Sequence, residues 1–163
     1  MDNFPKEIKM TSDILQVLLN CELLVTLSKE EINPIISLCR TEKYQPGEAI
    51  FHQGDQGKKI YIIKEGQVSI ERSVDLGDRK AQLNIAILGP GRALGSWLAL
   101  LGESHCLMSS ALCTRKTEVI AIEGPALREE LRKNLPAGFK VMERLAYMLR
   151  DRLRGVYGAM EKF

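Results

Sequence analysis

The segment Tyr44–Ile70, YQPGEAIFHQGDQGKKIYIIKEGQVSI, contains the pattern that decides the fold. Its short runs of β-branched and aromatic residues are Ala49–Phe51, Ile60–Ile63 and Val68–Ile70. Gly54 and Gly66 stand between these runs, and glycine readily adopts the positive φ that tight hairpins require. The segment therefore predicts short antiparallel strands joined by hairpins.

The same pattern continues to residue 123. Leu83–Leu88 is a further strand candidate and comes after the turn residues Gly77-Asp78. Val119–Ile122 is another, and lies beyond the turn residues Gly89-Pro90-Gly91. Short strands at this spacing indicate an antiparallel sandwich or jelly roll. We expect it to occupy residues 44–123.

The N-terminal part, residues 1–43, has helical periodicity instead. Apolar residues between Ser12 and Leu27 recur at intervals of three and four, which predicts one or two short helices. Ser28 and Glu31 then form a capping box, with reciprocal bonds between side chain and backbone. It predicts a second helix from Lys29 to Arg40.

The C-terminal part, residues 124–163, predicts two helices. Leu127 and Leu131 indicate a short one, and we expect a break at residues 135–138 (Leu-Pro-Ala-Gly) before a long final helix. An apolar stripe with a seven-residue repeat runs along that helix. The stripe fits packing on the chain's own β-core and a dimer seam about equally; we expect a homodimer through Leu145, Leu149 and Val156.

The chain is thus predicted to be a single domain, residues 1–163, mainly β with α. Its architecture is an antiparallel double-stranded β-roll (jelly roll) flanked by N-terminal helices and by two C-terminal helices, the last one long. Hydrophobic residues at 45% and charged residues at 27% are ordinary for a globular protein.

Composition argues against several functions. The only histidines are His52 and His105, and no C-x-x-C pair occurs among the four cysteines, so we expect no catalytic residues and no metal site. The net charge of +2 is too small to favour nucleic acid. No apolar run approaches 20 residues, and the first ten residues contain acids; we therefore expect a cytoplasmic protein with no membrane contact.

The residues quoted above closely resemble the first half of the cyclic-nucleotide-binding domain. That domain is shared by the catabolite activator protein family, the regulatory subunits of cyclic-AMP-dependent protein kinase and nucleotide-gated channels. The resemblance covers about residues 18–153, with the second half beginning at LNIAILGPGRALGSWLALLGE, residues 83–103. The matching positions in the first half are Gly47, Ile50, Gly54, Asp55, Tyr61, Gly66 and Val68.

This resemblance implies a phosphate-binding cassette that begins at Gly95. In the family a glutamate binds the ribose 2′-hydroxyl and an arginine binds the cyclic phosphate. Here Ser96 or Trp97 falls in the glutamate's place, and His105 or Cys106 in the arginine's place. His105 has two interpretations: when protonated it can partly replace the arginine, or it is a loop histidine without a ligand. Trp97 also has two: it packs into the core, or it fills the ligand cavity. The residues assigned to this degenerate cassette are Gly95, Ser96, Trp97, Leu98, Ala99, His105, Cys106, Ser109 and Ser110.

The resemblance implies a non-catalytic, ligand-sensing regulatory module whose cyclic nucleotide binding is weak or lost. The alternative is a functional cAMP- or cGMP-binding effector domain of a transcription regulator whose DNA-binding part is absent or on a partner. No cofactor is certain; the candidate ligands are a cyclic nucleotide (cAMP or cGMP) or another small anion. Because the sequence ends at Phe163, we expect no direct contact with nucleic acid, and the protein partner is unknown.

Overall fold

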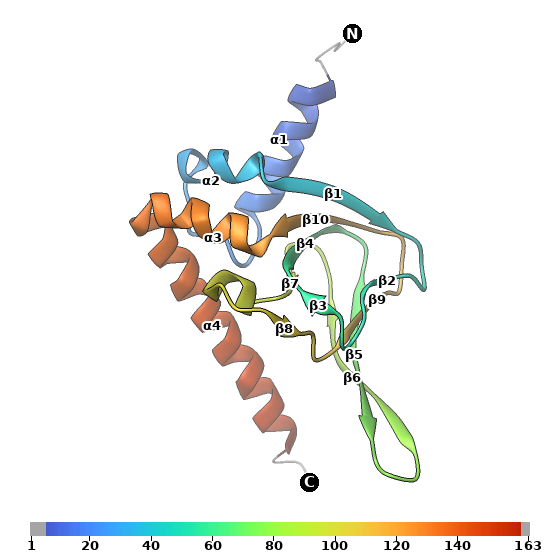
Figure 1. Cartoon of the computed structure of the whole chain (residues 1–163). Coiled ribbons are helices and arrows are strands. Elements are labelled where there is room, and N and C mark those ends of the chain that lie inside the picture. The colour runs from blue at the N-terminus through green and yellow to red at the C-terminus, as the bar shows by residue number, and fades with distance from the viewer. Residues whose placement is uncertain (1–5, 161–163) are drawn as a thin grey trace.

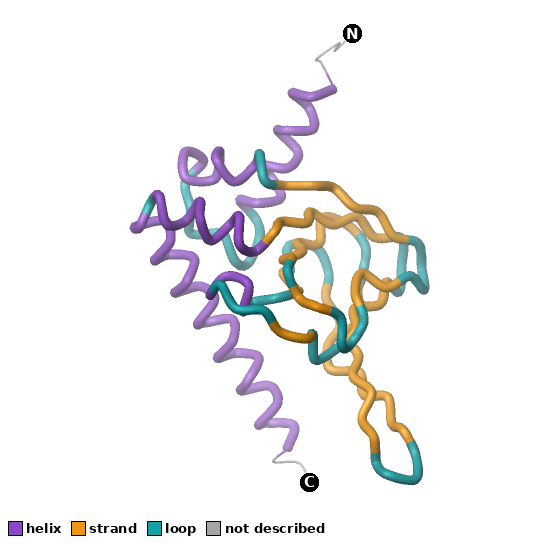
Figure 2. The backbone as a smooth tube through the Cα atoms, in the orientation of Figure 1, coloured by secondary structure: helices purple, strands orange, loops and turns teal. Residues whose placement is uncertain are grey.

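The structure is a computed structural model that describes residues 6–160, and of residues 6–9 and 156–160 the backbone alone. Helices gather on one side of the molecule and strands on the other (Figure 2). The long last helix, α4 (Leu135–Met160), runs along the helical side, and the hairpin of β5 (Val68–Asp75) and β6 (Lys80–Leu88) projects beyond the other strands (Figure 1).

The strands form a β-roll of two four-stranded sheets, which confirms the predicted fold class. The first sheet has the order β1-β10-β4-β7, the second has the order β2-β9-β5-β6, and β3 pairs with β8. All these pairings are antiparallel. The strands are β1 (Cys39–Tyr44), β2 (Ala49–Phe51), β3 (Gln56–Gly57), β4 (Lys59–Glu65), β5 (Val68–Asp75), β6 (Lys80–Leu88), β7 (Ala93–Gly95), β8 (His105–Cys106), β9 (Ser110–Cys113) and β10 (Thr117–Glu123).

Strand β4 separates two hydrophobic cores. Ile60 and Ile62 belong to the core under the helices, whereas Tyr61 and Ile63 belong to the core inside the roll. Successive side chains of a strand point to opposite faces. An apolar run without polar interruption is therefore buried on both faces, as in β4.

The N-terminal helices are α1 (Lys6–Leu19) and α2 (Lys29–Ile36). The capping box is confirmed: Ser28 Oγ accepts from Glu31 N, and Glu31 Oε2 accepts from Ser28 N. The prediction that α2 continues to Arg40 is wrong, because β1 begins at Cys39 and pairs with β10. The roll thus begins five residues before the expected boundary at residue 44.

The C-terminal helices are α3 (Gly124–Lys133) and α4 (Leu135–Met160), as predicted in number and order. The break lies at Asn134, not at residues 135–138. Asn134 Oδ1 accepts from Ala137 N, which caps α4. Pro136 falls in the first helical turn, where a missing N–H costs little.

The sequence analysis predicted that Leu145 lies in a dimer interface, but the structure places its side chain in the chain's own core. It is only 6% exposed and packs in the chain's own core with Val141 and Met148, whereas Leu149 and Leu153 are exposed. One face of α4 therefore covers the core and a different apolar face is open. The side chain of Val156 lies outside the described residues.

Candidate functional site

The candidate site is the segment 95–110, which we call the cassette segment. It starts at Gly95, the last residue of β7, whose φ is +112°. A Cβ on Gly95 would lie 2.4 Å from the backbone oxygen of Lys59. Both facts require glycine here. The short 3₁₀-helix η1 (Leu98–Leu101) follows.

Ser96 and His105 meet in this segment. Ser96 is fully buried, its backbone N–H donates to Lys59 O at 2.9 Å, and its Oγ accepts from Ala99 N at 3.3 Å. His105 Nδ1 lies 3.4 Å from the same Oγ. Ser96 and His105, two of the candidates for the positions of the family's charged pair, are thus neighbours, and the Ser96 hydroxyl is already engaged with the backbone of η1.

Trp97 faces the helical side. Its half-buried side chain packs on the core under the helices, and the Arg152 guanidinium of α4 lies 5.1 Å from its ring centroid. The structure therefore favours Trp97 as a packing residue over Trp97 as a residue that fills the roll.

The other predicted site residues lie in mixed surroundings. Ala99 is buried, Cys106 is exposed, and Leu98 and Ser109 are half-buried. Ser110 Oγ accepts from Gln53 N at 2.9 Å. All four cysteines are free thiols.

Sequence reasoning missed an ionic cluster behind the cassette segment, centred on Glu22. Glu22 Oε1 accepts from Ala93 N at 2.8 Å and lies 3.3 Å from Arg152 Nη2. Glu22 Oε2 lies 3.1 Å from Arg92 Nε. Arg144 Nε donates to Glu22 O at 3.0 Å. Burial lowers the pKa of Arg152, although Glu22 acts in the opposite direction.

This cluster connects three distant parts of the chain. Arg152 also donates to Ala93 O at 2.8 Å, and Arg128 of α3 donates to Leu100 O. Arginines of α3 and α4 thus hold the cassette segment from the helical side. The cluster joins residues up to 130 positions apart, and no local motif signals it.

Within the described residues, no group of three or more metal-ligating side chains occurs. In the same part of the chain, no helix has the length and apolarity needed to cross a membrane. The site is thus a glycine-initiated turn in a β-roll that α3 and α4 contact from one side.

Comparison with known proteins identifies the class. The family described as "Cyclic nucleotide-binding domain" matches residues 41–134, and the chain belongs to this family. It is a family of regulatory ligand-binding domains.

The chain is 34% identical over 131 residues to the cyclic AMP receptor protein of Thermus thermophilus. This match covers 78% of the present chain and 55% of the Thermus thermophilus protein. A cyclic nucleotide-binding domain from Methylobacillus flagellatus has a TM-score of 0.78 at 22% identity, covering 95% of this chain and 85% of that one. The Thermus thermophilus catabolite activator protein has a TM-score of 0.68 at 31% identity, covering 86% and 62%. The chain thus spans little more than half of the curated relative.

Proposed function

We propose that the chain is a non-catalytic, ligand-sensing regulatory module in which cyclic nucleotide binding is weak or lost. What supports this is the sequence of the cassette segment: neither Ser96 nor Trp97, the candidates for the family's glutamate position, is an acid, and neither His105 nor Cys106 is an arginine. Glu103 is the only carboxylate between Gly95 and Ser110, and no arginine occurs there.

The cost of the substitutions can be estimated. Loss of one partner of a buried charged hydrogen bond costs about 2–5 kcal/mol, which weakens binding by roughly 30-fold to several thousand-fold. Loss of the ribose acceptor adds about 1–3 kcal/mol. We therefore expect a cyclic AMP dissociation constant in the range of roughly tens of micromolar or weaker.

Calorimetric titration with cyclic AMP and cyclic GMP tests the proposal. The double variant Ser96→Glu, His105→Arg restores an acceptor for ribose and a charged donor for phosphate, and should bind cyclic AMP at least about tenfold more tightly than the parent chain. Because Ser96 is fully buried, the single variant His105→Arg is titrated as well, and circular dichroism checks each fold.

The matched control is Ser73→Glu with His52→Arg, which makes the same charge changes at two exposed positions outside the cassette segment. It should leave affinity unchanged. Nanomolar binding of cyclic AMP by the parent chain would overturn the proposal.

A second candidate function is a cAMP- or cGMP-responsive effector domain of a transcription regulator. The likeness to the Thermus thermophilus cyclic AMP receptor protein favours it. The same titration separates the two functions, since an effector domain requires tight binding by the parent chain. Either way, we propose a cytoplasmic protein whose domain makes no direct contact with nucleic acid, in keeping with a net charge of only +2.

We further propose a homodimer through the open apolar face of α4. Leu135, Phe139, Leu149 and Leu153 are its exposed large residues, at spacings that suit a coiled-coil seam. Leu149→Asp should convert the dimer to a monomer in light scattering. Arg154→Asp, an exposed change on the same helix away from this seam, should not. A parent chain that is monomeric at high micromolar concentration would refute this.

The effect of a ligand bound at the cassette segment would be transmitted to α4 through Arg152. Its contacts with Trp97 and Ala93 join the cassette segment directly to α4. A ligand that moves the cassette segment would therefore shift the helix and its seam, provided it binds the two arrangements with different affinity.

A further inference from the structure

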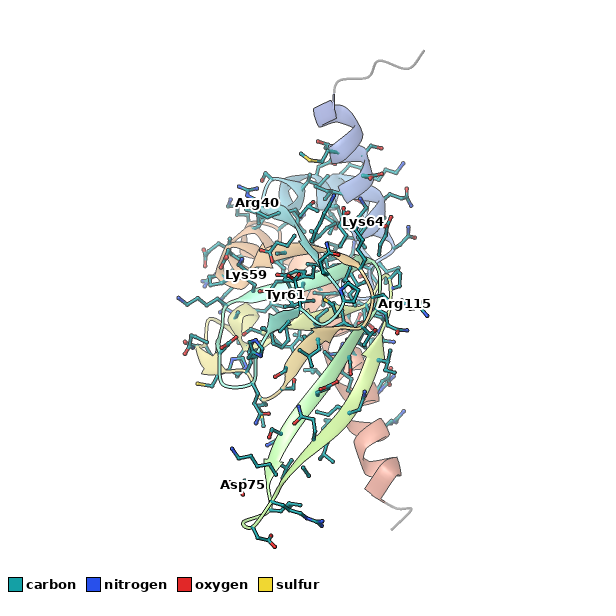
Figure 3. All side chains as sticks on the ribbon, turned by 90° about the vertical axis from the view of Figure 1, so that its right-hand side faces the viewer. Arg40, Lys59, Tyr61, Lys64, Asp75 and Arg115 are labelled. Atoms are coloured by element: carbon teal, nitrogen blue, oxygen red, sulfur yellow. The ribbon has the colours of Figure 1, made fainter. Side chains whose placement is uncertain are left out.

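A cavity of about 240 Å³ lies in the roll beside β2, β3 and the start of β4, and Leu107 of the cassette segment forms part of its wall. None of the predicted cassette residues lines it. Figure 3 shows two of its residues, Lys59 and Tyr61, on the face of the roll turned toward the viewer. Its lining consists of Ile50, Phe51, Asp55, Gln56, Gly57, Lys58, Lys59, Tyr61, Leu107 and Glu123.

The inner wall of this cavity is aromatic. The rings of Phe51 and Tyr61 lie with centroids 5.9 Å apart, and Ile50 and Leu107 extend the apolar surface. Such a wall favours an apolar body, and the faces of aromatic rings attract cations.

The Tyr61 hydroxyl is available to a ligand. Tyr61 is only 9% exposed, yet within residues 10–155 its hydroxyl has no hydrogen-bond partner. Burial raises the pKa of Tyr61, so the hydroxyl stays protonated and can both donate and accept. The described residues contain no fully buried side-chain nitrogen or oxygen without a partner, so this hydroxyl oxygen is in contact with solvent.

The charges at the rim favour a cation. Lys59 Nζ is already bonded to Glu42 Oε1 at 2.9 Å, outside the lining. Glu123 is 3.9 Å from Lys59 at its nearest approach, and within the described residues the Asp55 carboxylate accepts only the backbone N–H of His52. Lys58 has no ion pair in the described part of the chain. The lining holds two carboxylates, Asp55 and Glu123, and two ammonium groups, Lys58 and Lys59. Because Glu42 already pairs with Lys59, the rim together with Glu42 carries an excess of one negative charge.

We propose that this cavity binds a small organic ammonium whose body is aromatic or branched aliphatic. The body lies against Phe51 and Tyr61, and the ammonium donates to the Tyr61 oxygen and to the Glu123 carboxylate. Ligand cavities commonly measure roughly 300–1,000 Å³, so this one admits only a metabolite-sized molecule.

Gly57 lies in the cavity lining between two residues of the cassette segment, Leu107 and Ser96. A Cβ on Gly57 would lie 2.9 Å from Leu107 Cδ2 in the cavity wall and 2.9 Å from Ser96 Cβ. A ligand that presses on this wall would therefore act on the cassette segment directly at Leu107, and on Ser96 through Gly57. The proposal is independent of whether the cassette itself binds a nucleotide.

Three probes of similar shape and different charge test the proposal: 2-phenylethylamine, 2-phenylethanol and 3-phenylpropanoate. Binding to the full chain is followed by amide chemical shifts in a titration series. We expect the amine to bind at least about fivefold more tightly than the alcohol and the acid, with the largest shifts at Gly57 and Lys58.

Variants then test the named groups. Glu123→Gln and Tyr61→Phe should each weaken amine binding roughly three- to tenfold, whereas Lys58→Met should strengthen it. The matched control Glu129→Gln, an exposed acid of α3, should have no effect. Glu123 is 54% exposed, so its substitution is compatible with the fold. Preference for the acid, equal binding of all three probes, binding of none, or an unchanged affinity in Glu123→Gln would each overturn the proposal.

Discussion

The Arg152 side chain gives the sharpest stability prediction. We expect Arg152→Met, which keeps an apolar stem and removes the charge, to destabilise the protein by about 2–3 kcal/mol. The charged hydrogen bond to Ala93 O at 2.8 Å is worth about 1.5–3 kcal/mol. The contact with Trp97 at 5.1 Å adds about 0.5–2 kcal/mol.

Two effects limit the loss. The side chain is 33% exposed, so solvent screens its ion pair with Glu22. Glu22 also keeps Arg92 at 3.1 Å and the N–H of Ala93 at 2.8 Å. The variant therefore leaves no isolated buried carboxylate, which would raise the cost further.

Urea unfolding followed by circular dichroism measures the change, and the midpoint should fall by roughly 1–1.5 M. Trp97 is the only tryptophan, so its fluorescence reports the local change directly. The matched control is Arg150→Met. Arg150 also stacks on an aromatic ring, that of Tyr147 at 5.0 Å, but both side chains are exposed. Its loss should cost less than about 0.5 kcal/mol. Equal midpoints for the two variants, or unchanged Trp97 emission in Arg152→Met, would refute the reasoning.

Three other properties can be predicted. Gly66→Ala should cost about 3 kcal/mol or more in thermal unfolding, because Gly66 has φ +99° and its Cβ would lie 2.4 Å from a threonine oxygen; Gly77→Ala, at φ +89° with nothing within 4 Å, should cost only about 1–2 kcal/mol. Ellman's reagent at pH 8 should modify Cys106 quickly and the other three thiols only after unfolding, since Cys106 alone is exposed and burial raises the pKa of Cys21 to about 11. A hydrogen bond from a lysine lowers the pKa of Glu118 below its ordinary value of 4.5. The contribution of Glu118 to folding stability is therefore complete above pH 4.5 and is lost as the pH falls through the lower pKa of the folded state. Glu118→Gln should remove about 0.5–1 kcal/mol of stability at pH 7 and flatten the acid side of a stability–pH curve, and an unchanged curve would contradict this.

Features governed by neighbouring residues were predicted correctly from the sequence. The capping box at Ser28 and Glu31 forms because both partners lie within one helical turn. Gly54 and Gly66 adopt positive φ, as their turns require. The absence of arginine between Gly95 and Ser110, with Glu103 as the only carboxylate, is also readable from the sequence alone.

Features that depend on distant residues were not predicted. Strand β1 has the polar sequence CRTEKY, and it is a strand because its backbone pairs with β10, about 80 residues away. The stripe on α4 showed that the helix has apolar residues at regular intervals, but not that Leu145 faces the chain's own core while Leu149 does not.

The sequence by itself determined the glycine turns, the capped start of α2 and the presence of two C-terminal helices. These follow from local sterics and from the chemistry of single side chains, which act over a few residues. Only the tertiary structure decided that Arg152 reaches Trp97 and Glu22, and that Tyr61 and Glu123 line one cavity. Such contacts depend on how the sheets and helices pack, and packing is set by the burial of the whole apolar surface at once.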